Sequence, residues 1–362
     1  MKKNKEKILY LLHIDWNWIK QRPQFLAEGL AENNDIVCVY PFSWNLKKKT
    51  KNSHKNVKLI PIFQIPFNKY KIVRNTNRIM TNAIIRLISF LDKCTIIVIP
   101  SPWQYKSWMK KKKIVYDCMD NYKAFLSENI KDNFIKRERE LVHNSTEILA
   151  SSEYLIRELI KTYKVQKEKI HLVRNGYNNT GKVSLYDENS KKNSKFRIAY
   201  IGTIARWFDF NLITNSLTKV DNVEYHLAGP IDKDIMLSDS ENIIYDGMIQ
   251  HDQLGKYVSD FDCLIMPFIV NDIVEAVDPV KLYEYIDFNK NIICVFYNEI
   301  KRFEPYVHFY KNEDEFLQIV NSLKNTSEIK YSEKMRREFL SSNSWNNRIE
   351  AVEKVIRRLV QE

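Results

Sequence analysis

The chain has 362 residues, of which 44% are hydrophobic, 12% are aromatic and 28% are charged. This composition is typical of a folded globular protein and excludes a disordered or fibrous chain. One hydrophobic core rarely serves a chain of this length, so we expect two domains.

The charge is unevenly distributed along the chain. The net charge is +12, yet residues 1–180 contribute +18 and residues 181–362 contribute −6. A basic half attracts anions such as phospholipid headgroups, nucleic acid or acidic glycans. A Lys-rich and Asn-rich composition without functional meaning explains the same excess, so both interpretations stay open.

The cysteines and the apolar runs indicate a cytoplasmic protein. The five cysteines are widely spaced and form neither a CxxC pair nor a zinc-type cluster, which favours a reducing compartment. The apolar run at the N-terminus is short and leads into His13 and Asp15, so we expect a first strand rather than a signal peptide. No run approaches the roughly 20 apolar residues of a membrane-spanning helix.

Short β-branched runs alternate with amphipathic stretches in the first half of the chain. The runs cover residues 8–12, 36–40, 95–99, 113–116, 147–150 and 170–173. Such alternation predicts βαβ units with a parallel sheet.

Residues 69–91 predict an amphipathic helix within this half. One arc carries Ile72, Ile79, Met80, Ala83, Ile84 and Leu87. The opposite arc carries Arg74, Arg78 and Arg86. A helix of this kind either lies in an anionic membrane interface or covers a core. The basic runs at 47–51 and 110–113 favour the membrane, and the alternative stays open.

The second half repeats the α/β pattern after a polar stretch. Further β-branched runs cover residues 196–201, 224–228, 242–244, 262–268, 291–296 and 307–310. A last helix places Trp345, Ile349, Val352, Val355, Ile356 and Leu359 on one face. We therefore predict an N-terminal domain over 1–178, a linker over 179–195, a C-terminal domain over 196–340 and a closing helix over 341–362.

Two places after predicted strands carry candidate ligand-binding residues. Gly202 and Thr203 end one strand and are expected to lead straight into a helix, whose free N–H groups favour a phosphate, with Arg206 nearby. In a helix that begins near Pro279, Lys281 and Glu284 share a face. Lys281 would neutralise a diphosphate and Glu284 would accept hydrogen bonds from ribose hydroxyls. The alternative is a solvated intrahelical ion pair.

At this point the sequence resembles a known family. The segments GTIARWFDF (202–210), EYHLAGP (224–230), DGMIQHDQLGKYVSDFDCLIMPF (246–268) and DPVKLYEY (278–285) occur in the order found in the donor-binding half of family 4 glycosyltransferases. The likeness is greatest to bacterial capsule and teichuronic-acid-type enzymes. Segments 15–30, 115–125, 148–155 and 173–177 also look like that group, so the resemblance runs from residue 8 to about 356.

The resemblance implies an α/β fold of the GT-B type. Two Rossmann-like α/β/α domains would face a cleft, and the C-terminal helix would pack back toward the N-terminal, acceptor-binding domain. A hexose would pass from a UDP, GDP or dTDP sugar to a glycan or lipid-linked acceptor in cell-surface polysaccharide synthesis. Transfer would retain the anomeric configuration and need no metal. The protein would be peripheral at the inner face of the cell membrane.

The resemblance also assigns site residues. Donor binding falls to Gly202, Thr203, Arg206, Gly229, Asp246, Met248, Ile249, Pro279, Val280, Lys281 and Glu284. The catalytic carboxylate beside the sugar corresponds to Glu275 or Asp278, with Lys281 also placed in the catalytic set. The family has seven residues between its two glutamates, whereas Glu275 and Glu284 have eight between them. No lysine follows Arg206 within its predicted helix, so Lys281 is expected to supply that charge.

The N-terminal half offers candidate acceptor residues in His13, Asp15, Trp16, Trp18 and Arg22. Tryptophan faces suit a stacked sugar ring and an arginine suits an anion. Buried packing of both tryptophans is the alternative.

One carboxylate of the N-terminal half is a candidate catalytic base. Asp120 follows a predicted strand, where it would take the proton of an acceptor hydroxyl. The alternative, which the sequence favours slightly, is a cap on the next helix.

Two other classes of function stay open. A non-catalytic GT-B partner subunit would explain the departures around Glu275. A basic nucleic-acid-binding protein would explain the charge, but no nucleic-acid module is recognisable, so no nucleic-acid partner is expected.

Overall fold

The computed structural model describes residues 5–42, 56–177, 195–326 and 328–361. These form two compact units, one of Met1–Asn175 with Trp345–Glu362 and one of Gly176–Ser344. The predicted linker, apart from Lys195, and the basic run at 47–51 lie outside the described residues.

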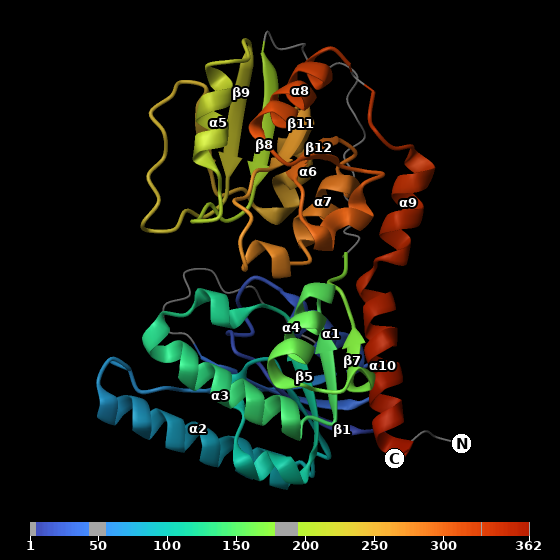
Figure 1. The fold of residues 1–362 in the computed structure, drawn as a ribbon. Coiled ribbons are helices and arrows are strands. Elements are labelled where there is room, and N and C mark those ends of the chain that lie inside the picture. The colour runs from blue at the N-terminus through green and yellow to red at the C-terminus, as the bar shows by residue number, and fades with distance from the viewer. Residues whose placement is uncertain (1–4, 43–55, 178–194, 327, 362) are drawn as a thin grey trace. The chain divides into compact units, whose positions relative to one another are not determined.

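The first unit is a seven-stranded parallel sheet with helices on its faces (Figure 1). The strand order is β3-β2-β1-β4-β5-β6-β7, with β1 Lys7–Leu11, β2 Asp35–Pro41, β3 Val57–Ile62, β4 Ile96–Ile99, β5 Lys113–Cys118, β6 Glu147–Ala150 and β7 Ile170–Leu172. The helices are α1 Arg22–Leu30, α2 Lys71–Leu91, α3 Glu128–Asn144 and α4 Glu153–Tyr163. Because β1 has β2 on one side and β4 on the other, the order in which strands are added to the sheet reverses there, and ligands of parallel sheets bind at such points.

The second unit repeats this plan with a six-stranded parallel sheet. The order is β10-β9-β8-β11-β12-β13, with β8 Phe196–Ile201, β9 Val223–Ala228, β10 Ile243–Gly247, β11 Cys263–Met266, β12 Asn291–Val295 and β13 His308–Tyr310. Its helices are α5 Phe210–Leu217, α6 Leu254–Ser259, α7 Val280–Asp287, α8 Glu313–Lys324 and α9 Glu333–Ser342. The reversal lies between β8 and β11.

Almost every strand occupies an apolar run recognised in the sequence. The exception is β3, which the sequence analysis missed because Pro61 interrupts its apolar run. Proline has no backbone N–H, so a strand that contains it loses one hydrogen bond of the ladder. The structure places β3 at the edge of the sheet, where that loss is tolerated.

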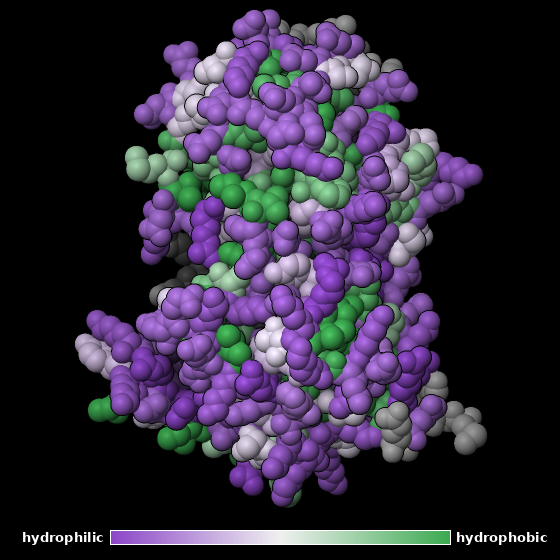
Figure 2. All heavy atoms as spheres, in the orientation of Figure 1, coloured by the Kyte–Doolittle hydropathy of each residue, from purple (hydrophilic) through white to green (hydrophobic). Residues whose placement is uncertain are grey.

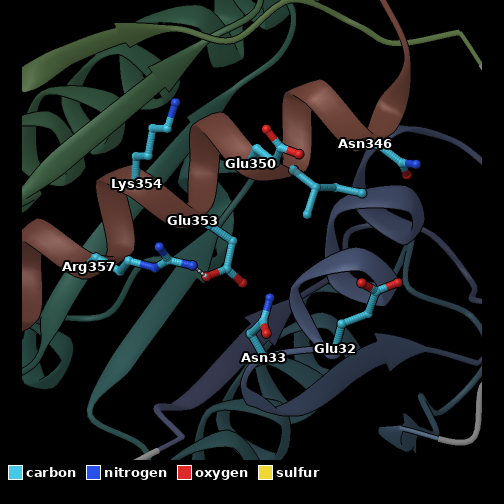
Figure 3. Close-up of a pocket in the computed structure, with 8 residues that line it drawn as sticks. Glu32, Asn33, Asn346, Glu350, Glu353, Lys354 and Arg357 are labelled. Atoms are coloured by element: carbon cyan, nitrogen blue, oxygen red, sulfur yellow. Dashed lines mark ion pairs between the residues drawn. The ribbon is translucent and has the colours of Figure 1, made fainter. Parts of the chain in front are cut away.

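The closing helix α10, Trp345–Gln361, belongs to the first unit and packs against α1. Trp345 stacks on Phe25 with ring centroids 4.7 Å apart, and Val352, Val355, Ile356 and Leu359 complete the same core. A polar hollow of about 480 Å³ lies beside this contact, where Glu32 and Asn33 face the outer turns of α10 (Figure 3). The predicted return of the C-terminal helix to the N-terminal domain is confirmed.

Helix α2 leaves the predicted apolar arc in solvent. Its buried residues are Asn77, Ile85, Ile88 and Ser89, whereas Ile72 is 81% exposed. Figure 2 shows hydrophobic side chains standing out from a hydrophilic surface along the edge where α2 runs. Covering a core, one of the two roles left open by the sequence, therefore does not explain this arc.

All five cysteines are buried and unpaired, as their spacing suggested. In the part of the chain that the structure describes, no helix combines the length and apolarity needed to cross a bilayer.

Candidate active site

The second unit gathers its predicted donor-binding residues at the carboxyl ends of β8 and β9. Helix α7 is anchored there by Tyr285, whose hydroxyl accepts the N–H of Ile201 at 2.9 Å and lies 3.3 Å from the carbonyl of the same residue. Tyr285 is buried, so this anchor is shielded from water. The first turn of α7 is thereby held beside the residues that follow β8.

Lys281 passes directly over Gly202. A Cβ on Gly202 would lie 1.8 Å from Cε of Lys281 and 2.7 Å from its Nζ. A Cβ on Gly229 would lie 2.2 Å from the carbonyl oxygen of Gly202. Both glycines are therefore required by close approach, one to a side chain and one to backbone. The structure thus brings Lys281, Gly202 and Gly229 together, as the sequence analysis expected.

The predicted helix directly after Gly202 is wrong. Residues 202–209 form an irregular loop, because buried Ile204 and Phe208 pair with Ile231 and Phe268 instead of entering a helix. Helix α5 begins only at Phe210, and the carboxylate of Asp209 already accepts the N–H of Leu212 at 3.0 Å. The N-terminus of α5 is therefore occupied by its own cap and is not the anion site that the sequence suggested.

The remaining donor candidates around this loop differ in exposure. Thr203 is half-buried and its carbonyl accepts the hydroxyl of Tyr200 at 2.8 Å. Arg206 is exposed. Pro279 is buried as the N-cap residue of α7, and Val280 is the exposed first residue of that helix.

Lys281 and Glu284 lie on the same face of α7. Burial lowers the pKa of Lys281, and the nearby Glu284 carboxylate opposes this shift. Burial likewise raises the pKa of Glu284, against the attraction of Lys281 and His251. Glu284 still exposes 32% of its side chain, and His251 Nε2 lies 3.9 Å from its Oε1. Lys281 and Glu284 are therefore neither fully solvated, as in a surface ion pair, nor fully buried, as in an internal one.

The structure separates the two candidates for the sugar-side carboxylate. Asp278 is buried, pairs with Arg302 and lies 3.2 Å from the hydroxyl of Tyr283. It is therefore a structural group, and its assignment as a catalytic residue is corrected. Glu275, in a short turn held by the Asn271 carbonyl, is half-buried. Of the two candidates, Glu275 is the one whose carboxylate is not paired with Arg302.

The donor-binding candidates at the end of β10 are only partly free to contact a ligand. The carboxylate of Asp246 accepts the hydroxyl of Tyr257 at 2.5 Å and lies 2.9 Å from Nδ1 of His226. Because its Oδ2 holds both partners, Asp246 stabilises the end of β10. Met248, 65% exposed, and half-buried Ile249 follow it.

In the first unit, Arg22 is committed to the interior. Its Nη2 donates to Asp117 Oδ1 at 2.8 Å and its Nη1 donates to the Val173 carbonyl at 2.6 Å. Both members of the ion pair are buried. The predicted role of Arg22 as an anion ligand of the acceptor is therefore corrected to a link between α1, β5 and the segment after β7.

Asp120 follows β5 and caps no helix. The next turn, Tyr122–Phe125, has Asn121 as its N-cap residue without a side-chain hydrogen bond. The slightly favoured capping role is therefore wrong. Burial raises the pKa of Asp120 to about 7, with Arg22 opposing and Asp117 adding to the shift. A carboxyl group with this pKa is suited to exchange protons near neutral pH.

The tryptophans of the N-terminal loop differ. Trp16 is fully buried in the core of the first unit, so its role as a sugar platform is corrected to packing, whereas Trp18 is 43% exposed. Asp15 is buried and accepts the backbone N–H of Asn17 at 2.9 Å, which shapes the loop. His13 lines a pocket, lies 3.2 Å from the Tyr122 hydroxyl through Nε2, and has its pKa lowered by burial.

That pocket contains basic residues that the sequence analysis missed. Lys106 and Arg137 line it together with Arg74 and Arg78 of α2. Lys106 follows β4, so the rule that ligands gather beyond strand ends was the signal that could have identified it. Arg137 lies in the middle of α3, and no sequence pattern distinguishes it from the other cations of that helix.

No cluster of three or more His, Cys, Asp or Glu side chains that could hold a metal ion occurs among the described residues.

Comparison with known proteins places these observations in context. No protein-family model matches the chain. The teichuronic acid biosynthesis glycosyltransferase TuaH of Bacillus subtilis (strain 168) is 22% identical over 383 residues, which cover 94% of this chain and 95% of TuaH.

Solved structures share the fold over nearly the whole chain. Sucrose-phosphate synthase of Thermosynechococcus elongatus aligns with a TM-score of 0.74 at 11% identity, covering 99% of this chain and 100% of that one. HepE of Anabaena, in complex with UDP and glucose, aligns with a TM-score of 0.67 at 10% identity, covering 97% and 99%. A glycosyltransferase of Rickettsia africae aligns with a TM-score of 0.68 at 14% identity, covering 99% and 100%.

These findings confirm the predicted fold class and the predicted resemblance: the chain has the fold of GT-B glycosyltransferases, and it is similar in sequence to TuaH over nearly its whole length.

Proposed function

We propose that this chain transfers a hexose from a nucleoside diphosphate sugar to a glycan or lipid-linked acceptor in cell-surface polysaccharide synthesis. In this reaction the bond between the anomeric carbon and the diphosphate breaks, and a bond forms between that carbon and an acceptor oxygen. The acceptor hydroxyl loses its proton and the nucleoside diphosphate leaves. The name of the relative TuaH supports the polysaccharide assignment, and HepE in complex with UDP and glucose supports the donor class.

The position of Lys281 over Gly202 is the observation that carries the proposal. It places a cation at the carboxyl ends of the parallel strands, where phosphate groups bind in this class of fold. A cation there would stabilise the charge that grows on the diphosphate as it leaves. Exposed Arg206, in the loop after Gly202, would add a second positive charge.

Two carboxylates complete the donor assignment. Glu284 would accept hydrogen bonds from the vicinal ribose hydroxyls, because its carboxylate remains partly exposed one helical turn after Lys281. Glu275 would face the sugar, because Asp278 is already paired with Arg302. Asp120 of the first unit is the candidate for taking the acceptor proton.

Retention of configuration, independence of metals and attachment to a membrane are parts of the proposal. A diphosphate held by Lys281 and Arg206 has its charge balanced by side chains, which would make a divalent metal unnecessary. The exposed apolar arc of α2, flanked by Lys69, Lys71 and Arg86, would lie in the headgroup region of an anionic bilayer at the cytoplasmic face.

Nucleotide binding by the purified chain tests the proposal. In isothermal titration calorimetry with UDP, GDP and dTDP, we expect one nucleotide to bind. Lys281→Ala should weaken that binding at least tenfold, since one charge-assisted hydrogen bond to a phosphate is worth roughly this factor.

Lys334→Ala on α9 is the matched control, because that ammonium is 83% exposed and its ion pair among the described residues is with Glu338 of its own helix. It should bind like the parent. If none of the three nucleotides binds the parent, the enzymatic proposal fails and a non-catalytic GT-B subunit becomes the better explanation.

A further inference from the structure

A pocket of about 610 Å³ lies within the first unit, at the carboxyl ends of β1 to β4. His13 and Gln104 form part of its floor, following β1 and β4, and α2 and α3 contribute its walls. The strand order of the sheet reverses between β1 and β4, and the pocket lies at this point. Parallel α/β sheets bind ligands at this kind of position, and the pocket belongs to the first unit alone.

The walls of this basic pocket carry positive charge only. Arg74, Arg78, Lys106 and Arg137 line it, and none of its lining residues is aspartate or glutamate. Among the described residues, none of the four cations forms an ion pair. Lys106 donates to the Trp103 carbonyl at 3.1 Å, and Arg137 lies over the Trp103 ring, 5.5 Å from its centroid.

Crowding of like charges is costly in the absence of an anion. The pKa of Lys106 is lowered to about 8, first by burial and then by Arg137 and Arg78. The part of this shift that comes from Arg137 and Arg78 reflects repulsion among the three cations. An anion in the pocket would reverse that penalty.

Polar atoms in the wall lack protein partners. Nδ1 of His13, Oε1 of Gln104 and Nε of Arg137 are buried and have no hydrogen-bond partner in the part of the chain that the structure describes. The wall itself is held in place, since Nε2 of Gln104 donates to the Leu12 carbonyl at 2.8 Å and Asn77 exchanges two hydrogen bonds of 2.9 Å with the backbone of Ile65. The residues that carry the unpartnered atoms therefore belong to the lining of a formed site.

We propose that the basic pocket binds a phosphate or diphosphate group carried by the acceptor, an inference that rests on the proposed function and names the acceptor's class. Four cations without a carboxylate suit an oxyanion of high charge. The opposite face of α2 is apolar and exposed, so a phosphate attached to a lipid is the favoured source. A nucleic acid would instead need a basic stripe extending beyond one enclosed pocket.

The test uses the full chain and three phosphate probes: inorganic pyrophosphate, glucose 1-phosphate and farnesyl phosphate, with farnesol as the uncharged control. We expect calorimetry to detect binding of the phosphates and not of farnesol. Arg78→Gln and Arg137→Gln should each weaken it at least tenfold. Arg139→Gln removes the same charge from an exposed position of α3 that does not line the pocket, and it should leave binding unchanged.

The probe that binds most tightly identifies the source of the phosphate: a free anion, a sugar phosphate or a lipid phosphate. The inference is overturned if the parent protein binds none of the three phosphate probes. It is also overturned if the Arg78 and Arg137 variants bind them as tightly as the parent does. Tighter binding of a single-stranded oligonucleotide than of any probe overturns it as well.

Nucleotide binding keeps the two proposals apart. The Arg78 and Arg137 variants should bind the nucleoside diphosphate like the parent, which also shows that they are folded. Lys281→Ala should keep its phosphate binding in the first unit while losing the nucleotide.

Discussion

Gly202 and Gly229 follow neighbouring strands, and each leaves no room for a Cβ. The obstacles differ in kind. At Gly202 the obstacle is the end of the Lys281 side chain, which can swing away, whereas at Gly229 it is the carbonyl of Gly202, which cannot move without the strand. Gly202 therefore leaves room for the Lys281 side chain, and Gly229 leaves room for the backbone of the neighbouring strand end.

Alanine at these two positions should consequently have different effects. Gly202→Ala should displace Lys281 and weaken nucleotide binding at least tenfold, and its φ of +156° strains an alanine, so it should also cost some stability, though less than a backbone clash costs. Gly229→Ala forces backbone apart and should lower the free energy of unfolding by about 2 kcal/mol. Thermal denaturation and nucleotide titration of both variants provide the check. Equal loss of stability in the two variants would contradict the assigned obstacles.

At this scale the sequence predicts positions better than partners. It placed Lys281 and Gly202 in one donor site, because their segments occur in the order found in the family that the sequence resembles. It could not foresee that Arg22 pairs with Asp117, 95 positions along the chain, or that Asp278 pairs with Arg302. Pairing of buried charges is decided by tertiary structure, so a conspicuous arginine or carboxylate can be structural or functional with the same local pattern.

Helix α2 shows how one element can serve two environments. Its inner face meets the sheet through Ile85 and Ile88, and Arg74 and Arg78 line the basic pocket. Its outer face exposes Ile79, 65%, and other apolar side chains. The helical period predicted both faces, but period alone does not say which face is buried, because burial depends on the sheet beneath.

The outer face of α2 should bind anionic bilayers. Ile79→Glu or Leu87→Glu should reduce sedimentation with vesicles that contain phosphatidylglycerol, since a carboxylate opposes both the apolar contact and the negative surface. Ile130→Glu on α3 is the control, because Ile130 is also exposed and lies on another helix. Unchanged sedimentation of the two α2 variants would remove the membrane from the proposed function.

For the molecule as a whole, the fold was largely predictable and the chemistry less so. Apolar runs separated by amphipathic stretches identify parallel α/β units, and they did so everywhere except at the proline-interrupted edge strand β3. The loop after β8 was predicted as helix because a glycine at the end of a parallel strand commonly leads into one. Pocket residues such as Arg137 stayed unrecognised, since they meet only when α3 packs beside the end of β4.

The last helix is part of the first unit, so its core residues should control that unit's stability. Ile356→Ala leaves a cavity in the first unit and should lower its free energy of unfolding by about 3 kcal/mol. Val360→Ala on the exposed side of the same helix should change it by less than about 0.5 kcal/mol. In differential scanning calorimetry of the Ile356→Ala variant, the melting temperature of the first unit should fall and that of the second unit should not change. A uniform shift of both transitions would contradict the assignment.

The return of α10 to the first unit also has a consequence during synthesis. Domains usually fold in the order in which the ribosome delivers them. Here the sheet of the first unit is complete by Leu172, but Trp345 and Leu359 of its core come only after the whole of the second unit. The nascent first unit therefore waits with an uncovered apolar face beside α1, and the second unit can finish folding first. A chaperone that binds nascent chains would be expected to bind this uncovered apolar face.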